Sequence, residues 1–174
     1  MRAASILALG AVATMLSASI AEAKLERAYI GTFTAPPGRP TQAGNRAEGI
    51  YVTELDTLTG KLTTPRLVAK TASPSWLVYD KARGILYATN EYDGFTDPKT
   101  GARSGSISAY RVDKASGALS PLPPVPVTNS TNLALDPSGK WMMGASWAHG
   151  AASLLPVAGS NAFTDTIMSC SNTV

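Results

Sequence analysis

The sequence predicts an all-β protein built from repeated small sheets, and three observations support this fold class. After residue 24 the apolar residues stand in short continuous or alternating runs, which is the spacing of strands. No stretch there keeps the i, i+3, i+4, i+7 apolar spacing of an amphipathic helix. Similar segments also recur along the chain at a nearly constant interval. We expect strands at residues 27–33, 49–55, 62–70, 74–79, 85–90, 106–112, 133–136, 141–146 and 152–157.

The predicted turns use residues that suit tight backbone geometry. An Asp side chain can accept hydrogen bonds from the amides that follow it, and a Gly can adopt a positive φ. Three segments run from an Asp to a Gly in this way, at residues 56–60, 113–117 and 136–139. Each is flanked by apolar residues, so each predicts a sharp turn between strands.

The turns and strands recur in register. Asp56 and Gly60 match Asp113 and Gly117 at one common offset. A second set matches at an offset that differs by a single residue: Leu77, Asp80 and Gly94 with Leu133, Asp136 and Gly150. A third copy begins nearer to its counterpart, and we attribute the shorter spacing to an extended polar loop at residues 91–103. A repeated unit of ~40–50 residues made of strands alone is typical of β-propeller blades. A β-sandwich, which also has regularly spaced strands, is the alternative.

Residues 1–23 have the pattern of a secretory signal peptide. Arg2 precedes an uncharged apolar stretch, which ends at Ala21-Glu22-Ala23. We expect cleavage after Ala23, which leaves residues 24–174 as a periplasmic or secreted protein. An uncleaved anchor is the alternative, because residues 3–21 approach the ~20 residues that cross a bilayer. No later segment is apolar enough to span one, so we expect no membrane contact after cleavage.

Composition argues against several other classes of protein. The chain has 15 Lys and Arg against 12 Asp and Glu, and the basic residues are scattered, so we expect no nucleic-acid partner. A hydrophobic content of 44% with 16% charged residues is not that of a disordered chain. Cys170 is the single cysteine, which excludes an internal disulfide framework and a cysteine-based metal site. We expect neither a metal nor a cofactor.

Five segments of the chain, taken in order, resemble one known family. They are residues 29–34 (YIGTFT), 49–52 (GIYV), 74–77 (PSWL), 86–91 (LYATNE) and 133–139 (LALDPSG). The series resembles the lactonase family of seven-bladed β-propellers, which includes the cycloisomerase-type 6-phosphogluconolactonases and the 3-carboxymuconate lactonising enzymes. The resemblance implies seven blades, which need more than about 300 residues. We therefore expect residues 24–174 to be a partial propeller of about three blades, the N-terminal portion of a longer protein. A short protein that dimerises to close a ring is the alternative.

The resemblance implies a lactone substrate, and Asn90 and Glu91 are the candidate residues that bind it. Lactone hydrolysis needs a polarised carbonyl and an activated water, which His, Glu, Asp and Arg side chains can provide. The resemblance places the family's catalytic His, Arg and Glu in later blades, so the catalytic residues remain unknown in this chain. Asn90 and Glu91 end a predicted strand, where Glu91 is either a channel-facing acid that binds substrate hydroxyls or a solvated strand end.

Other candidate groups have weaker patterns. His149 is the only histidine, at a position where the family usually has a small residue. Residues 144–148 fall one short of the G-x-S-x-G nucleophile elbow, and we expect a strand after them where the elbow needs a helix. Glu91, Asp93 and Asp97 lack the alternate spacing of a calcium loop. We expect the large aromatic residues to pack between blades; these are Trp76, Tyr79, Tyr87, Trp141 and Trp147.

Two functions are consistent with these observations. The first is a lactonase-type hydrolase of a sugar-acid lactone, similar to 6-phosphogluconolactonase and inactive as this portion alone. The second is a non-enzymatic propeller that binds a partner, because the propeller fold serves both uses. Phosphogluconolactone is a cytoplasmic metabolite, so the expected export favours another lactone. The sequence does not predict which lactone or which oligomeric state.

Overall fold

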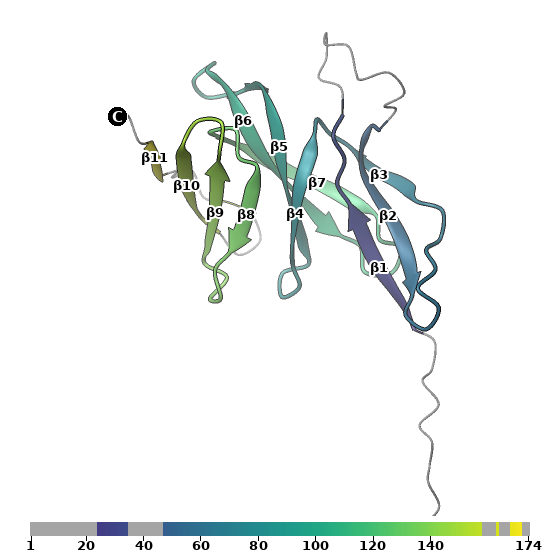
Figure 1. Cartoon of the computed structure of the whole chain (residues 1–174). Helices are drawn as coiled ribbons and strands as arrows, with labels where there is room; N and C mark the ends of the chain where they lie inside the picture. The colour runs from purple at the N-terminus through teal and green to yellow at the C-terminus, as the bar shows by residue number, and fades with distance from the viewer. Residues whose placement is uncertain (1–23, 35–46, 158–162, 164–167, 172–174) are drawn as a thin grey trace, which may run out of the picture.

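The computed structural model describes residues 24–34, 47–157, 163 and 168–171 of the chain. In this part the regular secondary structure consists of β-strands, which form three antiparallel sheets. Figure 1 shows the sheets side by side, in the order in which the chain builds them. The predicted all-β class is confirmed. None of the described residues form a helix that could cross a bilayer. The predicted signal peptide lies outside the described residues.

Each sheet is a meander in which strands that follow one another in the chain lie side by side. Sheet A contains β1 (Leu25–Ile30), β2 (Gly49–Asp56) and β3 (Arg66–Lys70). Sheet B contains β4 (Pro74–Asp80), β5 (Ile85–Thr96), β6 (Arg103–Val112) and β7 (Leu119–Val127). Sheet C contains β8 (Asn132–Leu135), β9 (Trp141–Ser146), β10 (Ala151–Pro156) and β11 (Met168–Ser171). Small four-stranded meanders repeated in this way are the blades of a propeller.

Strand pairing confirms the repeat that the sequence predicts. In sheet B, Tyr79 lies opposite Leu86, and in sheet C Leu135 lies opposite Met142. Leu135 follows Tyr79 in the sequence at the same interval as Met142 follows Leu86. β4 and β8 are therefore equivalent inner strands. They are also in contact with one another, so the two sheets adjoin at this edge.

The largest differences from the predicted strands occur at four places. No strand was predicted at β7, whose nine residues include four prolines; proline is tolerated on an outer strand because the outer edge needs no amide donor. The strand predicted at 62–70 starts only at Arg66. The predicted loop at 91–103 is mostly a long hairpin of β5 and β6, which turns at residues 97–101. The C-terminal segment, for which no strand was predicted, contributes β11, and its backbone pairs with β10.

Two apolar cores fill the spaces between the sheets. Alternate residues of β5 serve different cores, since Ile85 and Tyr87 pack toward sheet C while Leu86 and Ala88 pack toward sheet A. The core between sheets B and C also contains Ile107, Leu133, Met142 and Leu155. The core between sheets A and B contains Ile50, Tyr110 and Val112. Burial of these faces holds the three sheets in one body.

The expected packing of the aromatic residues between blades holds only for Tyr87, which is fully buried. Exposed fractions are 45% for Trp76, 42% for Tyr79, 40% for Trp141 and 78% for Trp147. In β9 every second residue is buried, and Trp141 and Met143 lie on the other side of the sheet. No described sheet covers that side of sheet C, so these side chains remain in contact with solvent.

Candidate functional site

Asn90 lies where β5 departs from regular pairing with β6. All hydrogen-bonding positions of its side chain are occupied by other groups of the protein. Asn90 Nδ2 donates to Thr71 Oγ1 and to the Ala72 carbonyl, both at 2.7 Å. Asn90 Oδ1 accepts from Ser106 Oγ at 3.3 Å and from Ser108 Oγ at 2.5 Å. An amide group has two donor hydrogens and two acceptor lone pairs, so these four bonds satisfy it. Asn90, with 4% of its surface exposed, thus connects β5 and β6 to residues 71–72, which precede β4.

A second set of bonds ties Ser73 to Thr34, in the segment that follows β1. Ser73 precedes β4, is completely buried and has φ of +38°, a region that non-glycine residues seldom occupy. Its amide donates to Thr34 Oγ1 at 2.8 Å, and its hydroxyl donates to the Thr34 carbonyl at 3.1 Å. The Ser73 carbonyl accepts from the amide of Glu91 at 3.0 Å. The backbone of Glu91 is therefore held by Ser73, which is itself bonded to Thr34.

Glu91 lies at this bonded end of sheet B, and its side chain is half-buried. Pairing between β5 and β6 breaks after Asn90 and resumes at Phe95, so Glu91 belongs to an irregular segment. A carboxylate on a segment whose start is anchored by Asn90 and Ser73 can accept hydrogen bonds from a hydroxylated ligand. Asn90 and Glu91 were predicted from their family-like pattern, whereas nothing in the sequence distinguishes Ser73 or Ser108 from the other serines.

Ser146 is the counterpart of Asn90 in sheet C, and it pairs with His149. Ser146 Oγ and His149 Nδ1 are 3.1 Å apart. Ser146 is buried while His149 is exposed, and the turn between them leads into β10. The expected strand after residues 144–148 is thus confirmed, and the strand-to-helix geometry of a nucleophile elbow is not formed. The contact ties the turn to the end of β9.

One acidic residue near the tip of the β5–β6 hairpin, Asp97, has a structural role. Asp97 Oδ1 accepts from the amide of Lys99 at 2.9 Å, and Asp97 Oδ2 accepts from Thr100 Oγ1 at 2.8 Å. Both bonds lower the pKa of Asp97, the amide of Lys99 contributing most. Asp97 therefore caps a turn. Across the described ranges of the chain, no group of three or more His, Cys, Asp or Glu residues is placed to hold a metal.

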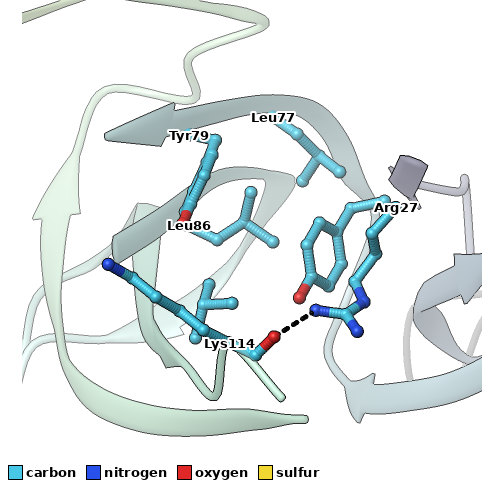
Figure 2. A pocket seen from close by; sticks show the side chains of 7 residues that line it. Arg27, Leu77, Tyr79, Leu86 and Lys114 are labelled. Carbon is cyan, nitrogen blue, oxygen red and sulfur yellow. Dashed lines mark hydrogen bonds between the residues drawn. The ribbon is translucent and has the colours of Figure 1, made fainter. Parts of the chain in front are cut away.

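A pocket of about 430 Å³ lies between sheets A and B, away from Asn90 and Glu91. Figure 2 shows Arg27 of β1, Leu77 and Tyr79 of β4, Leu86 of β5, and Lys114 around it. Tyr29 and Val112 complete the lining. Arg27 reaches the turn after β6, where its guanidinium donates to the carbonyls of Lys114 and Ala115, both at 3.0 Å.

The pocket walls are apolar at Leu77, Leu86 and Val112 and cationic at Arg27 and Lys114. Tyr29 adds a hydroxyl that donates to the Gly117 carbonyl at 3.0 Å. Burial raises the pKa of Tyr29, so this group stays a neutral donor at physiological pH. The pocket was not predicted from the sequence, because its residues come from four strands and one turn that lie far apart in the chain.

Comparison with known proteins agrees with the three-sheet architecture. A family model described as "Lactonase, 7-bladed beta-propeller" matches residues 27–173, which include nearly all of the three sheets. The chain belongs to this lactonase family. The resemblance predicted from the sequence is thereby confirmed, and the three antiparallel sheets of this lactonase-family chain are consistent with a partial propeller.

Individual relatives match at modest identity. The chain is 29% identical over 131 residues to the 6-phosphogluconolactonase of Bacillus subtilis, covering 74% of this chain and 32% of the relative. A periplasmic gluconolactonase of Pseudomonas aeruginosa has the same fold, with a TM-score of 0.65, 24% identity, and coverage of 83% of this chain and 39% of that one. A protein from Lactobacillus plantarum matches with a TM-score of 0.63, 25% identity, and coverage of 83% and 37%. This lactonase-family chain thus spans about a third of the curated relative that it matches.

Proposed function

We propose that a protein containing this chain hydrolyses a sugar-acid lactone. The observation that supports this most is the family match over residues 27–173, which includes both Asn90 and Glu91. The relative from Bacillus subtilis bears the name of a lactonase. Hydrolysis of a lactone adds water across the ring ester and yields an open-chain acid, for which the protein must bind the polyhydroxylated ring and activate a water.

In this proposal Glu91 binds substrate and Asn90 positions it. The carboxylate of Glu91 accepts hydrogen bonds from ring hydroxyls, and its backbone is held by the bond from its amide to the Ser73 carbonyl. Asn90 is already bonded to four protein groups, so a direct bond to substrate would break at least one of them. The catalytic base and the groups that stabilise the oxyanion come from further blades, and sheets A, B and C alone are inactive.

We propose also that the protein is exported and that its lactone is not phosphorylated. The signal-peptide pattern of residues 1–23 supports export. The fold is shared with a gluconolactonase named as periplasmic. Recovery of the protein from the periplasm or medium with Lys24 as its first residue would confirm cleavage after Ala23. Recovery with Met1 intact in the membrane fraction would contradict it.

Lactone hydrolysis is tested by comparing the 174-residue chain with a longer gene product that contains it. Both are assayed on glucono-δ-lactone, 6-phosphogluconolactone and a carboxylated muconolactone, against the spontaneous rate of each. We expect turnover by the longer protein only, with glucono-δ-lactone preferred. Equal turnover by the shorter chain would contradict the need for further blades. Binding of lactones without turnover by the longer protein would favour the non-enzymatic alternative.

The role of Glu91 is tested in the longer protein with Glu91→Gln. Loss of the charged acceptor should raise KM about tenfold with a smaller change in kcat, because the interaction binds ground state and transition state alike. Asp93→Asn is the matched control, since Asp93 is an exposed acid two residues away in the same hairpin. Equal effects of the two substitutions would contradict a specific role for Glu91.

A further inference from the structure

Trp147 is the most exposed large apolar residue among those that the structure describes, with 78% of its surface open to solvent. It is the first residue of the turn at 147–150, between β9 and β10. An indole has a large flat apolar face and one hydrogen-bond donor at its edge. Such a group suits a ligand that has an apolar face and polar edges of its own.

The repeat makes Trp147 the counterpart of Glu91. Trp147 follows Ser146 as Glu91 follows Asn90, and Ser146 occupies the place of Asn90 in sheet C. In sheet B the regular pairing of β5 with β6 breaks after Asn90, and in sheet C the pairing of β9 with β10 ends at Ser146. Glu91 and Trp147 are therefore the first residues beyond the regular pairing of two equivalent strands.

The two positions lie at the same end of adjacent sheets. In Figure 1 the β5–β6 hairpin and the β9–β10 turn both lie at the upper end of their sheets. Sheets B and C adjoin where the inner strands β4 and β8 are in contact. One rim of two neighbouring sheets thus has a carboxylate at Glu91 and an indole at Trp147, at equivalent positions.

The turn that contains Trp147 is held by contacts on both sides of this residue. Ser146 is buried, with 4% of its surface exposed, and its Oγ lies 3.1 Å from His149 Nδ1. The amide of Gly150 donates to the Trp147 carbonyl at 3.4 Å, and Gly150 has φ of +55°, a region that favours glycine. A residue on a fixed turn loses less conformational freedom when a ligand covers it.

A carboxylate and an indole complement the two kinds of surface on a sugar lactone. The ring of a sugar-acid δ-lactone has hydroxyl groups around its edge and C–H groups on its faces. Contact of the C–H face with an indole removes apolar area of both from water. A carboxylate accepts hydrogen bonds from the hydroxyls.

We propose that Trp147 binds the C–H face of the lactone ring while Glu91 accepts hydrogen bonds from its hydroxyls. The ligand class in this inference rests on the proposed lactone hydrolysis. The inference adds a substrate-binding residue from sheet C to the one proposed in sheet B. The ring is therefore held between two adjacent sheets, by one apolar contact and one polar contact.

The test uses the longer gene product that contains this chain, with 5-fluorotryptophan in place of tryptophan. Its ligand is the δ-lactam of gluconic acid, which keeps the hydroxylated ring but resists hydrolysis, so binding is measured apart from turnover. We expect the fluorine resonance of Trp147, assigned by its loss in Trp147→Phe, to shift with millimolar lactam. Trp141 is the matched control, because it is also exposed, at 40%, but begins β9 at the opposite end of that strand. Its resonance should not move.

Substitution then measures the contribution of the indole. Trp147→Ala should weaken lactam binding about tenfold and raise KM for glucono-δ-lactone by a similar factor, with a smaller change in kcat. Trp147→Phe keeps an aromatic face and should lose less, while Trp141→Ala should change neither quantity. An unmoved Trp147 resonance, or equal effects of Trp147→Ala and Trp141→Ala, would overturn the inference.

A ligand without hydroxyl groups separates recognition of the sugar ring from general stickiness of the indole. δ-Valerolactam has the same ring without the hydroxyls, so it should bind at least about tenfold more weakly than the gluconic lactam. Glu91→Gln should weaken binding of the gluconic lactam and leave that of δ-valerolactam unchanged. Equal affinity for the two lactams at Trp147 would overturn the inference.

The outcomes also distinguish this inference from lactone hydrolysis itself. Turnover of glucono-δ-lactone that is unaffected by Trp147→Ala would overturn the inference and leave hydrolysis supported. Binding of the gluconic lactam at Trp147 without turnover of any lactone would support the indole contact and contradict hydrolysis.

Discussion

The hydroxyl of Ser108 on β6 donates a hydrogen bond of 2.5 Å to Asn90 Oδ1 on β5. Together with the bonds from Asn90 Nδ2 to Thr71 and Ala72, it joins two strands and a link that the sequence separates by 18 residues or more. A buried side chain with all its polar atoms bonded contributes to the position of its neighbours as well as to stability.

Asn90→Asp should destabilise the chain by about 1–3 kcal/mol, because a carboxylate cannot donate to the Ala72 carbonyl and leaves that group unpaired. Urea unfolding followed by circular dichroism measures the loss. Asp93→Asn, at an exposed site in the same hairpin, should change stability by less than about 0.5 kcal/mol. Equal stability of Asn90→Asp and the parent chain would contradict the bonding described for Asn90.

Two equivalent glycines provide a matched pair of substitutions. Gly60 and Gly117 have φ of +71° and +72°, so alanine should cost about 1–2 kcal/mol at either position. A Cβ on Gly60 would meet no atom within 4 Å, while a Cβ on Gly117 would lie 2.6 Å from Arg27 Nε. Gly117→Ala should therefore displace Arg27 from its two carbonyls and cost about 1 kcal/mol more. Thermal unfolding measures both.

The extra cost at Gly117 should vanish in an Arg27→Ala background, where the two alanine substitutions should have equal effects. Persistence of the difference without the Arg27 side chain would show that another contact causes it. The cycle of single and double variants isolates the pairwise effect, because the Arg27 side chain contacts the turn that contains Gly117.

Asp80 should make stability depend on acid pH. Burial raises the pKa of Asp80, but its bonds with the side chain and backbone of Arg83 outweigh burial, and the pKa lies below its ordinary value. A carboxyl whose pKa is lower in the folded state stabilises it above the unfolded pKa of about 4. That contribution is lost as pH falls through the folded pKa. Asp80→Asn should cost about 1–3 kcal/mol at pH 7 and progressively less as pH falls below 4.

Urea midpoints of the parent and Asp80→Asn chains between pH 2 and pH 8 measure this effect. Asp136→Asn is the control at the equivalent turn, where the carboxylate bonds Ser138 and Trp141 but forms no ion pair with a described residue. Its effect should be smaller at neutral pH. A constant difference between parent and Asp80→Asn at all pH values would contradict the lowered pKa.

Tyr87→Phe should leave stability unchanged or raise it by up to about 1 kcal/mol, because removal of an unpaired buried hydroxyl relieves its desolvation cost. The Tyr87 hydroxyl is buried and bonds to no described residue, and burial, with a smaller effect of the Asp80 charge, raises its pKa to about 12. Tyr29→Phe is the control, because it deletes the bond to the Gly117 carbonyl and should cost about 0.5–1.5 kcal/mol. A loss above about 1 kcal/mol in Tyr87→Phe would reveal a bonded hydroxyl.

The sequence predicts the repeated strands well because a buried strand shows its alternation locally. Trp141–Ser146 was predicted to the residue, and its alternating burial shows why. The same local signal fails for the outward residues of β9, since Trp141 looks like a core residue although its side of the sheet has no described cover. Burial depends on a neighbouring sheet, which the residues of one strand do not reveal.

The candidate site was predicted only in part. The position of Asn90 and Glu91 at a strand end followed from the sequence, but the bonds that hold Asn90 come from segments up to 19 residues away. The pairing of Ser146 with His149 across one turn was also not predicted. The pocket lined by Arg27 and Leu77 was not predicted either, because its residues lie on strands far apart in the sequence.

The prolines of β7 affect the association of these molecules at high concentration. β7 is the outermost strand of sheet B, and its four prolines lack the amide hydrogen that an incoming strand would use. The free edge of β7 therefore offers too few amide donors for a strand of a second molecule to extend the sheet. The outer circumference of the blade is protected from fibre-like growth by the same residues that hide the strand from sequence-based recognition.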